Sequence, residues 1–152
     1  MRRKEREITS IDEIEKVIKS ADVCRIGLTD GDEPYTVPVC FGYERNAIYF
    51  HGALEGRKVE LIRKNNRVCF EVDADVEIVA SEKPCKWTVK YRSVMGTGRA
   101  FILESDEAKV WALKLITGKY SGREYDFTKS QADSVSVVKV DIESITGKKS
   151  GY

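Results

Sequence analysis

The sequence has one histidine, no excess of either charge and no long hydrophobic run. Lysine and arginine number 26 against 25 aspartate and glutamate, which gives a net charge of +1. Proteins that bind nucleic acid usually carry a strong basic excess, so this balance disfavours such a role. No apolar segment approaches membrane-spanning length, and residues 1–20 do not contain the apolar stretch of a signal peptide. We therefore expect a cytoplasmic protein that binds neither nucleic acid nor membrane.

Closely spaced cysteine pairs are also absent. The cysteines stand singly at Cys24, Cys40, Cys69 and Cys85, whereas zinc sites need ligands in close pairs, so we expect no metal site. All except Cys85 lie within apolar strand-like runs, which is typical of buried thiols in a reducing cytoplasm, and we predict that the cysteines belong to the core. The sequence likewise shows no Ser-His-Asp set, no paired carboxylates and no GxGxxG motif.

The chain length fits a single domain. A protein of 152 residues, 41% apolar and 34% charged, buries a sufficient core without disulfides or a structural metal. We therefore expect one domain over residues 1–152. The basic opening MRRKER is diluted by acidic residues, and we expect residues 1–8 to form a flexible, solvated arm.

Two segments have the pattern of amphipathic helices. Ser10-Ile11-Asp12-Glu13 is a capping-box pattern that begins a helix over about residues 11–20. Ser105 begins a second helix, and its apolar residues recur at helical spacing in an inward-facing stripe. The members of that stripe are Ala108, Trp111, Ala112, Leu115 and Ile116. The segment that follows, residues 117–133, reads as a loop.

Short apolar runs separated by turn residues predict strands. These runs are VCRIGL (23–28), YTVPVCFGY (35–43), AIYFH (47–51), RVCFEV (67–72), KWTVKYRSVMGTGRAFIL (86–103) and SVSVVKVDIESI (134–145), with a helix RKVELIRKN (57–65) between the third and fourth. Residues 86–103 form either one long strand or a pair of strands. In the last run the alternation shifts by one residue after Val137, which a β-bulge would explain. Strands joined mostly by turns indicate a mainly β (α+β) fold, an antiparallel barrel with peripheral helices.

The stretch IYFHGALEGRK, residues 48–58, runs from a strand through a glycine-containing turn into a helix. A helix N-terminus attracts anions, and glycines allow the backbone to approach a ligand. Arg57 is able to hold a phosphate by two parallel hydrogen bonds, Lys58 adds a compact charge, and His51 adds a donor. These residues form a candidate phosphate site. The alternative is a solvated cation pair beside a histidine that is only structural.

Two further features bear on a ligand site. Pro38 lies within a strand and removes a ladder donor, so the strand is an edge strand or is bulged there, and free backbone groups would be able to meet a planar polar ring. Gly96 and Gly98 lie on one strand face and allow close approach of either a ligand or another part of the core.

With these residues collected, the sequence resembles the nitroimidazole-resistance (Nim) proteins of the pyridoxamine 5'-phosphate oxidase-like superfamily of flavin-binding split barrels. The segments that carry the resemblance are MRRKERE, PYTVPVCFGYE, IYFHGALEGRK, RVCFEV, WTVKYRSVMGTGRA and ITGKKSG, in this order over nearly the whole chain. The resemblance implies an FMN-binding split β-barrel and a homodimer with flavin at the subunit interface. It implies FMN as the cofactor, with FAD as an alternative and haem or a deazaflavin as more distant ones.

The resemblance also assigns site residues by position. Arg57 and Lys58 would hold the FMN phosphate with the turn that contains Gly52, while His51 is the candidate catalytic residue. The remaining residues implied to bind the cofactor are Thr36, Val37, Pro38, Val39, Phe50, Ala53 and, from the partner subunit, Tyr91 and Ser93, with Lys148 closing the site. The C-terminus differs from that of the pyridoxamine-phosphate oxidases proper, so pyridoxamine phosphate is not the expected substrate.

The leading functional hypothesis is a flavin-dependent oxidoreductase that reduces nitro-aromatic or similar small acceptors. His51 would be its proton donor, because the usual pKa of histidine lies near neutrality; the alternative is a histidine that only hydrogen-bonds the cofactor. A flavin- or haem-binding module with little turnover, acting as a sensor or carrier, is the second hypothesis. A barrel that binds single-stranded nucleic acid is the third, and the near-neutral charge disfavours it.

Overall fold

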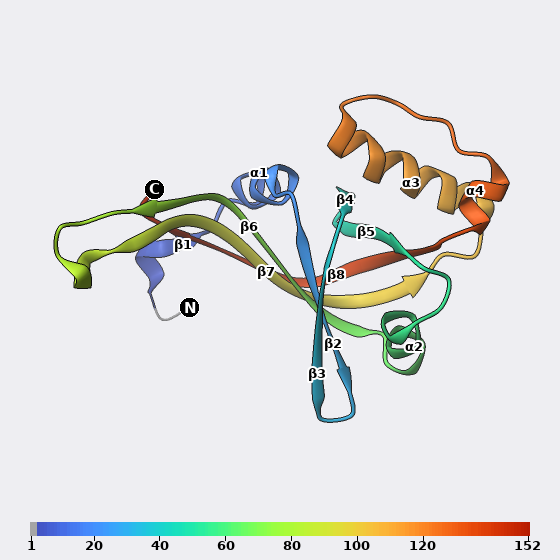
Figure 1. The fold of residues 1–152 in the computed structure, drawn as a ribbon, viewed down its shortest axis with the longest axis horizontal. Coiled ribbons are helices and arrows are strands. Elements are labelled where there is room, and N and C mark those ends of the chain that lie inside the picture. Colours follow the sequence, from blue (N-terminus) through green and yellow to red (C-terminus); the bar gives the residue numbers. More distant parts are fainter. Residues whose placement is uncertain (1–2) are drawn as a thin grey trace.

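The computed structural model describes residues 3–152, which form one antiparallel sheet with helices around it (Figure 1). The strands are β1 (Glu7–Ile8), β2 (Cys24–Asp30), β3 (Glu33–Val39), β4 (Phe41–Glu44), β5 (Ala47–Gly52), β6 (Arg67–Val79), β7 (Thr88–Ile102) and β8 (Ser136–Ser150). The helices are α1 (Ile11–Ser20), α2 (Arg57–Lys64), α3 (Asp106–Ser121) and α4 (Lys129–Asp133), with 3-10 turns at Lys4–Arg6 and Pro84–Lys86. The predicted mainly β antiparallel fold is confirmed.

The strand order is β3-β2-β6-β7-β8-β5-β4, with β1 added to β8. The segment 35–43 was predicted as one strand, and this prediction is wrong, because the chain breaks at Cys40 into β3 and β4. These strands form opposite edges of the sheet, and the N–H of Phe41 donates to the Tyr120 hydroxyl (3.0 Å). The two edges therefore meet at Cys40 without pairing, which gives an open, split barrel.

The predicted helix starts are confirmed by their caps. The Ser10 hydroxyl accepts a hydrogen bond from the Glu13 N–H at the start of α1, and Ser105 accepts one from the Ala108 N–H at the start of α3. The second half of the predicted capping box does not form, because the Glu13 carboxylate binds Lys149 (3.1 Å). In the predicted stripe of α3, however, Trp111 is 38% exposed, although it packs edge-on against Tyr49 with ring centroids 5.0 Å apart. Leu113 is buried in its place.

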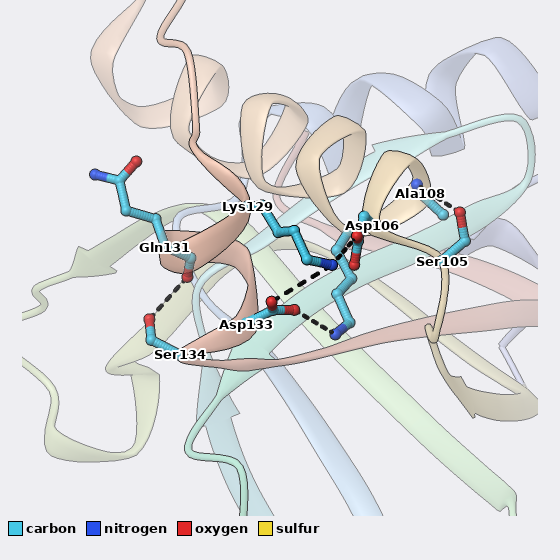
Figure 2. Close-up of polar contacts among 8 residues, drawn as sticks. Ser105, Asp106, Ala108, Lys129, Gln131, Asp133 and Ser134 are labelled. Atoms are coloured by element: carbon cyan, nitrogen blue, oxygen red, sulfur yellow. Dashed lines mark hydrogen bonds and ion pairs between the residues drawn. The ribbon is translucent and has the colours of Figure 1, made fainter.

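The segment predicted as a loop, 117–133, is partly helical. The helix α3 continues to Ser121, and α4 forms after a capping box at Thr128. Figure 2 shows how α4 is held on the start of α3: the Lys129 ammonium contacts the carboxylates of Asp106 and Asp133. Lys109 of α3 also forms an ion pair with Asp133 (3.4 Å).

The main core fills the inside of the curved sheet. Side chains from β2, β4, β5, β6, β7 and β8 meet there with the apolar faces of α1 and α2. A second cluster lies on the opposite face of β5 and β8, under α3 and α4. The strands β5 and β8 are thus buried on both faces, which places Val137 in the second cluster and Val138 in the first.

The prediction of a bulge after Val137 is wrong, because both faces of β8 are buried there. His51 pairs with Val137 and Phe50 with Val138 in regular register, so both valines are accommodated without an extra residue. A bulge does occur in β8, at Glu143, where the partners of Thr97 and Gly98 are not consecutive.

The glycines predicted to allow close approach serve the core rather than a ligand. A Cβ added to Gly96 would lie 2.4 Å from the Phe70 ring, and one added to Gly98 would lie 2.2 Å from the Asp141 carbonyl oxygen.

Three predicted core cysteines are exposed. Only Cys24 is buried, whereas Cys40, Cys69 and Cys85 are accessible. The alternation of the sheet explains Cys69, because Val68 and Phe70 on either side of it point into the core.

The predicted flexible arm over residues 1–8 is also only partly free. Met1 and Arg2 lie outside the described residues, but Ile8 is buried and pairs with Gly147.

One part of the sheet carries side chains that point away from both cores. We call it the outer face. Its residues are Arg25, Gly27, Thr36, Pro38, Cys69, Glu71, Asp73, Tyr91, Ser93, Met95 and Thr97, which follow one another across β3, β2, β6 and β7 in register. Met95, near its middle, is 58% exposed. The β6–β7 ribbon extends this face far from α2 and α3 (Figure 1).

Candidate functional site

The corner where β5 ends and α2 begins contains most of the predicted phosphate site. Gly56 precedes α2 with φ of +128°, a backbone conformation that favours glycine. It offers no side-chain cap, so the first N–H groups of α2 have no side-chain acceptor there. A Cβ added to Gly52 would lie 2.8 Å from the Lys58 Nζ. Glycine at this position therefore allows the lysine to lie against the β5 backbone.

Lys58 provides an uncompensated positive charge at this corner. Its ammonium lies 5.3 Å from the centre of the Phe50 ring, which is completely buried beneath it. Among residues 3–152, no carboxylate lies within ion-pair distance of Lys58. Burial lowers the pKa of Lys58 below its usual value. A half-buried cation without a counter-charge is the kind of group that a bound anion stabilises.

His51 lies on the face of β5 opposite to Phe50, and the positive charge of Lys58 acts on its imidazole. Its pKa is lowered, first by burial and second by the charge of Lys58. The imidazole is therefore mainly neutral at pH 7, with one nitrogen that donates and one that accepts. The sequence led us to expect a pKa near neutrality, and the structure shifts it downward.

Arg57 does not point to the same place as Lys58. Its guanidinium lies 4.8 Å from the centre of the Tyr35 ring and contacts the carboxylates of Glu33 (3.3 Å) and Asp30 (4.0 Å). The two cations that the sequence treats as a pair thus face different surroundings. Arg57 is partly neutralised by the β2–β3 hairpin.

The strand β3 borders this corner through Tyr35. It is an edge strand, as Pro38 predicted, and pairs only with β2. Thr36 and Pro38 are exposed on the outer face, whereas Val37 and Val39 turn toward the core. Any contact of the two valines with a flat ligand would therefore involve the backbone edge. Ala53, in the turn after β5, is exposed.

The remaining predicted residues lie elsewhere in the chain. Ser93 pairs with Lys148, whose ammonium lies 5.8 Å from the centre of the Tyr91 ring. Ser93 is three strands from β3 in the sheet, which at the usual strand spacing is roughly 15–20 Å from Pro38. A single chain does not bring these residues to the corner at Lys58.

Sequence reasoning missed two groups of residues near the site. Tyr35, Glu33 and Asp30 belong to a segment that reads only as strand and turn, and their contact with Arg57 depends on how α2 packs on the hairpin. The second group is an ion network on the outer face, in which Arg25 contacts Glu71 (3.0 Å) and Asp73 (2.6 Å). No signal in the sequence pairs residues so far apart.

A cavity of about 800 Å³ lies away from this corner. It lies between α1, β4, α3 and the loop after α3, and none of the predicted site residues lines it.

Among the described helices, none is long and apolar enough to cross a membrane.

A family model described as pyridoxamine 5'-phosphate oxidase matches residues 10–149. The chain belongs to this family. Comparison with curated proteins finds no match. Among solved structures, this pyridoxamine 5'-phosphate oxidase-like chain is similar to a candidate 5-nitroimidazole antibiotic resistance protein from Bacteroides thetaiotaomicron. The two share 33% identity and a TM-score of 0.83, over 94% of this chain and 86% of the other.

More distant relatives share the fold. A FAD and haem binding protein from Mycobacterium smegmatis has 16% identity and a TM-score of 0.84, over 97% of this chain and 74% of that one. A flavocytochrome from Azotobacter vinelandii has 17% identity and a TM-score of 0.80, over 96% and 70% of the two chains. The family and the split-barrel fold implied by the sequence resemblance are thus confirmed.

Proposed function

We propose that this protein is a flavoprotein that binds FMN at the corner between β5 and α2 and reduces small nitro-aromatic acceptors. The observation that carries the proposal is the Lys58 ammonium, half-buried and without a carboxylate partner among residues 3–152, beside an uncapped helix start. A phosphate monoester supplies the missing negative charge and accepts hydrogen bonds from the free N–H groups.

The residues at the corner fit such a cofactor. Lys58 and the first turn of α2 would hold the phosphate, with Arg57 beside them. The unpaired backbone edge of β3, interrupted at Pro38, would face the flat ring system, and Thr36 lies on the same strand. The glycine at position 52 keeps the Lys58 ammonium against the β5 backbone, because any side chain there would displace it.

A homodimer completes the site in this proposal. Tyr91, Ser93 and Lys148 lie too far from the corner in one chain, but they lie on or beside the exposed outer face. A second copy packed on that face would bring its own Tyr91 and Ser93 to the first chain's corner. The free cysteines fit a reducing cytoplasm as the location.

Bound flavin supplies the electron transfer, and the chain supplies binding, orientation and proton control. His51 would hold a proton at its imidazole nitrogen beside the cofactor, next to the Lys58 charge that lowers its pKa. The dimer contact would exclude water from this region.

The absorbance spectrum of the purified protein tests the cofactor. We expect flavin bands, and FMN rather than FAD in the supernatant after denaturation. Haem bands instead would favour a haem-binding module, which is the second candidate because two structural neighbours are described as a haem-binding protein and a flavocytochrome. A colourless protein that binds no added FMN would reject the proposal.

A turnover assay tests the reaction. With NADH or NADPH as donor and a 5-nitroimidazole as acceptor, we expect many turnovers per bound flavin. If the flavin is bound but only one equivalent of acceptor is reduced, the protein is a carrier or sensor rather than a reductase.

A further inference from the structure

The turn between β2 and β3 carries carboxylates that face the start of α2. The Glu33 carboxylate lies 3.3 Å from the Arg57 guanidinium, and the Asp30 carboxylate lies 4.0 Å from it. The guanidinium carbon of Arg57 also lies 4.8 Å from the centre of the Tyr35 ring. The protein itself therefore supplies carboxylate partners and an aromatic ring to Arg57.

A second cation of α2 meets the same turn. Lys64 lies seven residues after Arg57, so both side chains leave the same side of the helix, and the Lys64 Nζ lies 3.8 Å from Asp30. Two cations of α2 thus meet two carboxylates of the hairpin, and their formal charges cancel. Lys58 points toward β5, to the Phe50 ring and Gly52, and lies outside this neutral group.

We propose that Glu33 and Asp30 compete with the cofactor's phosphate for Arg57 and so limit how strongly the site prefers FMN to riboflavin. This inference rests on the proposed flavin site. The two carboxylates contact the guanidinium that would otherwise bind phosphate oxygens, and they repel a phosphate dianion at the same corner. Lys58 provides the net attraction, and the hairpin reduces it.

The expected effect is moderate because all three side chains are partly exposed. The side-chain exposures are 45% for Arg57, 70% for Glu33 and 41% for Asp30. Exposed ion pairs of this kind have small energies, so neutralising Glu33 should tighten FMN binding about threefold at low salt. Salt should reduce the effect, because screening weakens interactions between exposed charges.

The test compares FMN and riboflavin, which differ only in the phosphate. Flavin-free protein and its Glu33→Gln and Asp30→Asn variants are titrated with each flavin, and quenching of flavin fluorescence gives the dissociation constants. We expect both variants to bind FMN more tightly and riboflavin as before. Asp32→Asn is the matched control, since Asp32 lies in the same turn and makes no ion pair among the described residues.

A second arm separates competition from a structural effect of the hairpin. In an Arg57→Met background, Glu33→Gln should lose most of its effect on FMN binding, because the guanidinium that the Glu33 carboxylate contacts is gone. Weaker FMN binding in Glu33→Gln would show that Glu33 positions Arg57 for the phosphate and would overturn the proposal. An unchanged ratio of the two dissociation constants, or an equal change with Asp32→Asn, would overturn it as well.

The outcomes also distinguish this inference from the proposed function. If the wild-type protein binds FMN and riboflavin but the variants leave their ratio unchanged, only the role of the hairpin is rejected. If the wild-type protein binds neither flavin, the proposed function fails and the inference fails with it.

Discussion

At the scale of single residues, the site depends on how two adjacent cations differ. Arg57 is stacked on Tyr35 and paired with carboxylates, whereas Lys58 is half-buried without a carboxylate partner in the described chain. The charge of Lys58 is unfavourable to the flavin-free fold, because burial lowers its pKa. A charged side chain that destabilises the free protein and is stabilised by a bound ligand is typical of a binding site.

Replacing Lys58 by methionine should therefore have opposite effects on affinity and stability. We expect FMN binding to weaken by about tenfold to a hundredfold, as expected for a lost charge-assisted hydrogen bond, and riboflavin binding to change little. The flavin-free variant should melt at a higher temperature than the wild type. Lys16→Met, on the exposed side of α1, is the control and should change neither property. Equal losses for FMN and riboflavin would place Lys58 outside the phosphate site.

His51 should reveal its role in the pH dependence of turnover. If its imidazolium donates a proton, turnover falls as the pH rises through the pKa of His51, which lies below the usual value of about 6.5. We expect His51→Gln to keep normal flavin content, lower turnover at least tenfold and remove this limb of the pH profile. Unchanged turnover with normal flavin content would leave His51 only a hydrogen-bonding role.

At the scale of elements, the local signals in the sequence were reliable and the long-range ones were not. Both helix caps, the edge character of the strand with Pro38 and the strand-to-helix turn at 48–58 depend on neighbouring residues and were predicted correctly. The break at Cys40 and the burial of both faces of β5 depend on partners far along the chain. Alternation alone therefore misplaced the bulge in β8 and the exposed cysteines.

The candidate site shows the same division. The sequence placed His51, Gly52 and Lys58 at one corner, because residues 51–58 run directly from the end of β5 into the start of α2. The pairing of Arg57 with Glu33 could not be predicted from the sequence, because that contact depends on the packing of α2 on the β2–β3 hairpin. The placement of Ser93 and Tyr91 beside a flavin rests on the family resemblance and stays a prediction.

The contact between α3 and α4 should be sensitive to acid. Hydrogen bonding to Lys129 holds the pKa of Asp106 below its usual value (Figure 2). The folded protein thus gains stability from the ionised Asp106 at neutral pH and loses it as the pH falls through this lowered pKa. We expect Lys129→Met to lower the urea midpoint at pH 7, with Lys16→Met as the control. The difference should shrink at pH 3, and a difference of the same size at both pH values would contradict this assignment.

At the scale of the whole molecule, the exposed outer face is the proposed dimer contact. Met95 lies near its centre and is 58% exposed in one chain. A lysine there would place an unpaired charge in the contact, so we expect Met95→Lys to be monomeric in size-exclusion chromatography with light scattering and to bind FMN poorly. Tyr125→Lys, in an exposed loop, is the control and should remain dimeric.

The thiols provide a second readout of the same face. Cys24 is buried, and burial raises its pKa to about 12, so it should resist alkylation in any folded form. Cys69 lies on the outer face, whereas Cys40 and Cys85 do not. We expect Cys69 to react with iodoacetamide much faster in Met95→Lys than in the wild type, as measured by mass spectrometry. A flavin-loaded monomer with reactive Cys69 would exclude a site shared between subunits.

The pairing of β5 with β8 has a consequence for biosynthesis. His51 and Gly52 are aligned by Val137 and Ser136, which leave the ribosome some time after the corner they support. Pairings between distant segments form slowly, because a long loop must close first. The nascent chain therefore carries its glycine turn and its cations long before they have a scaffold, and the completed corner emerges only when the last strand has been synthesised.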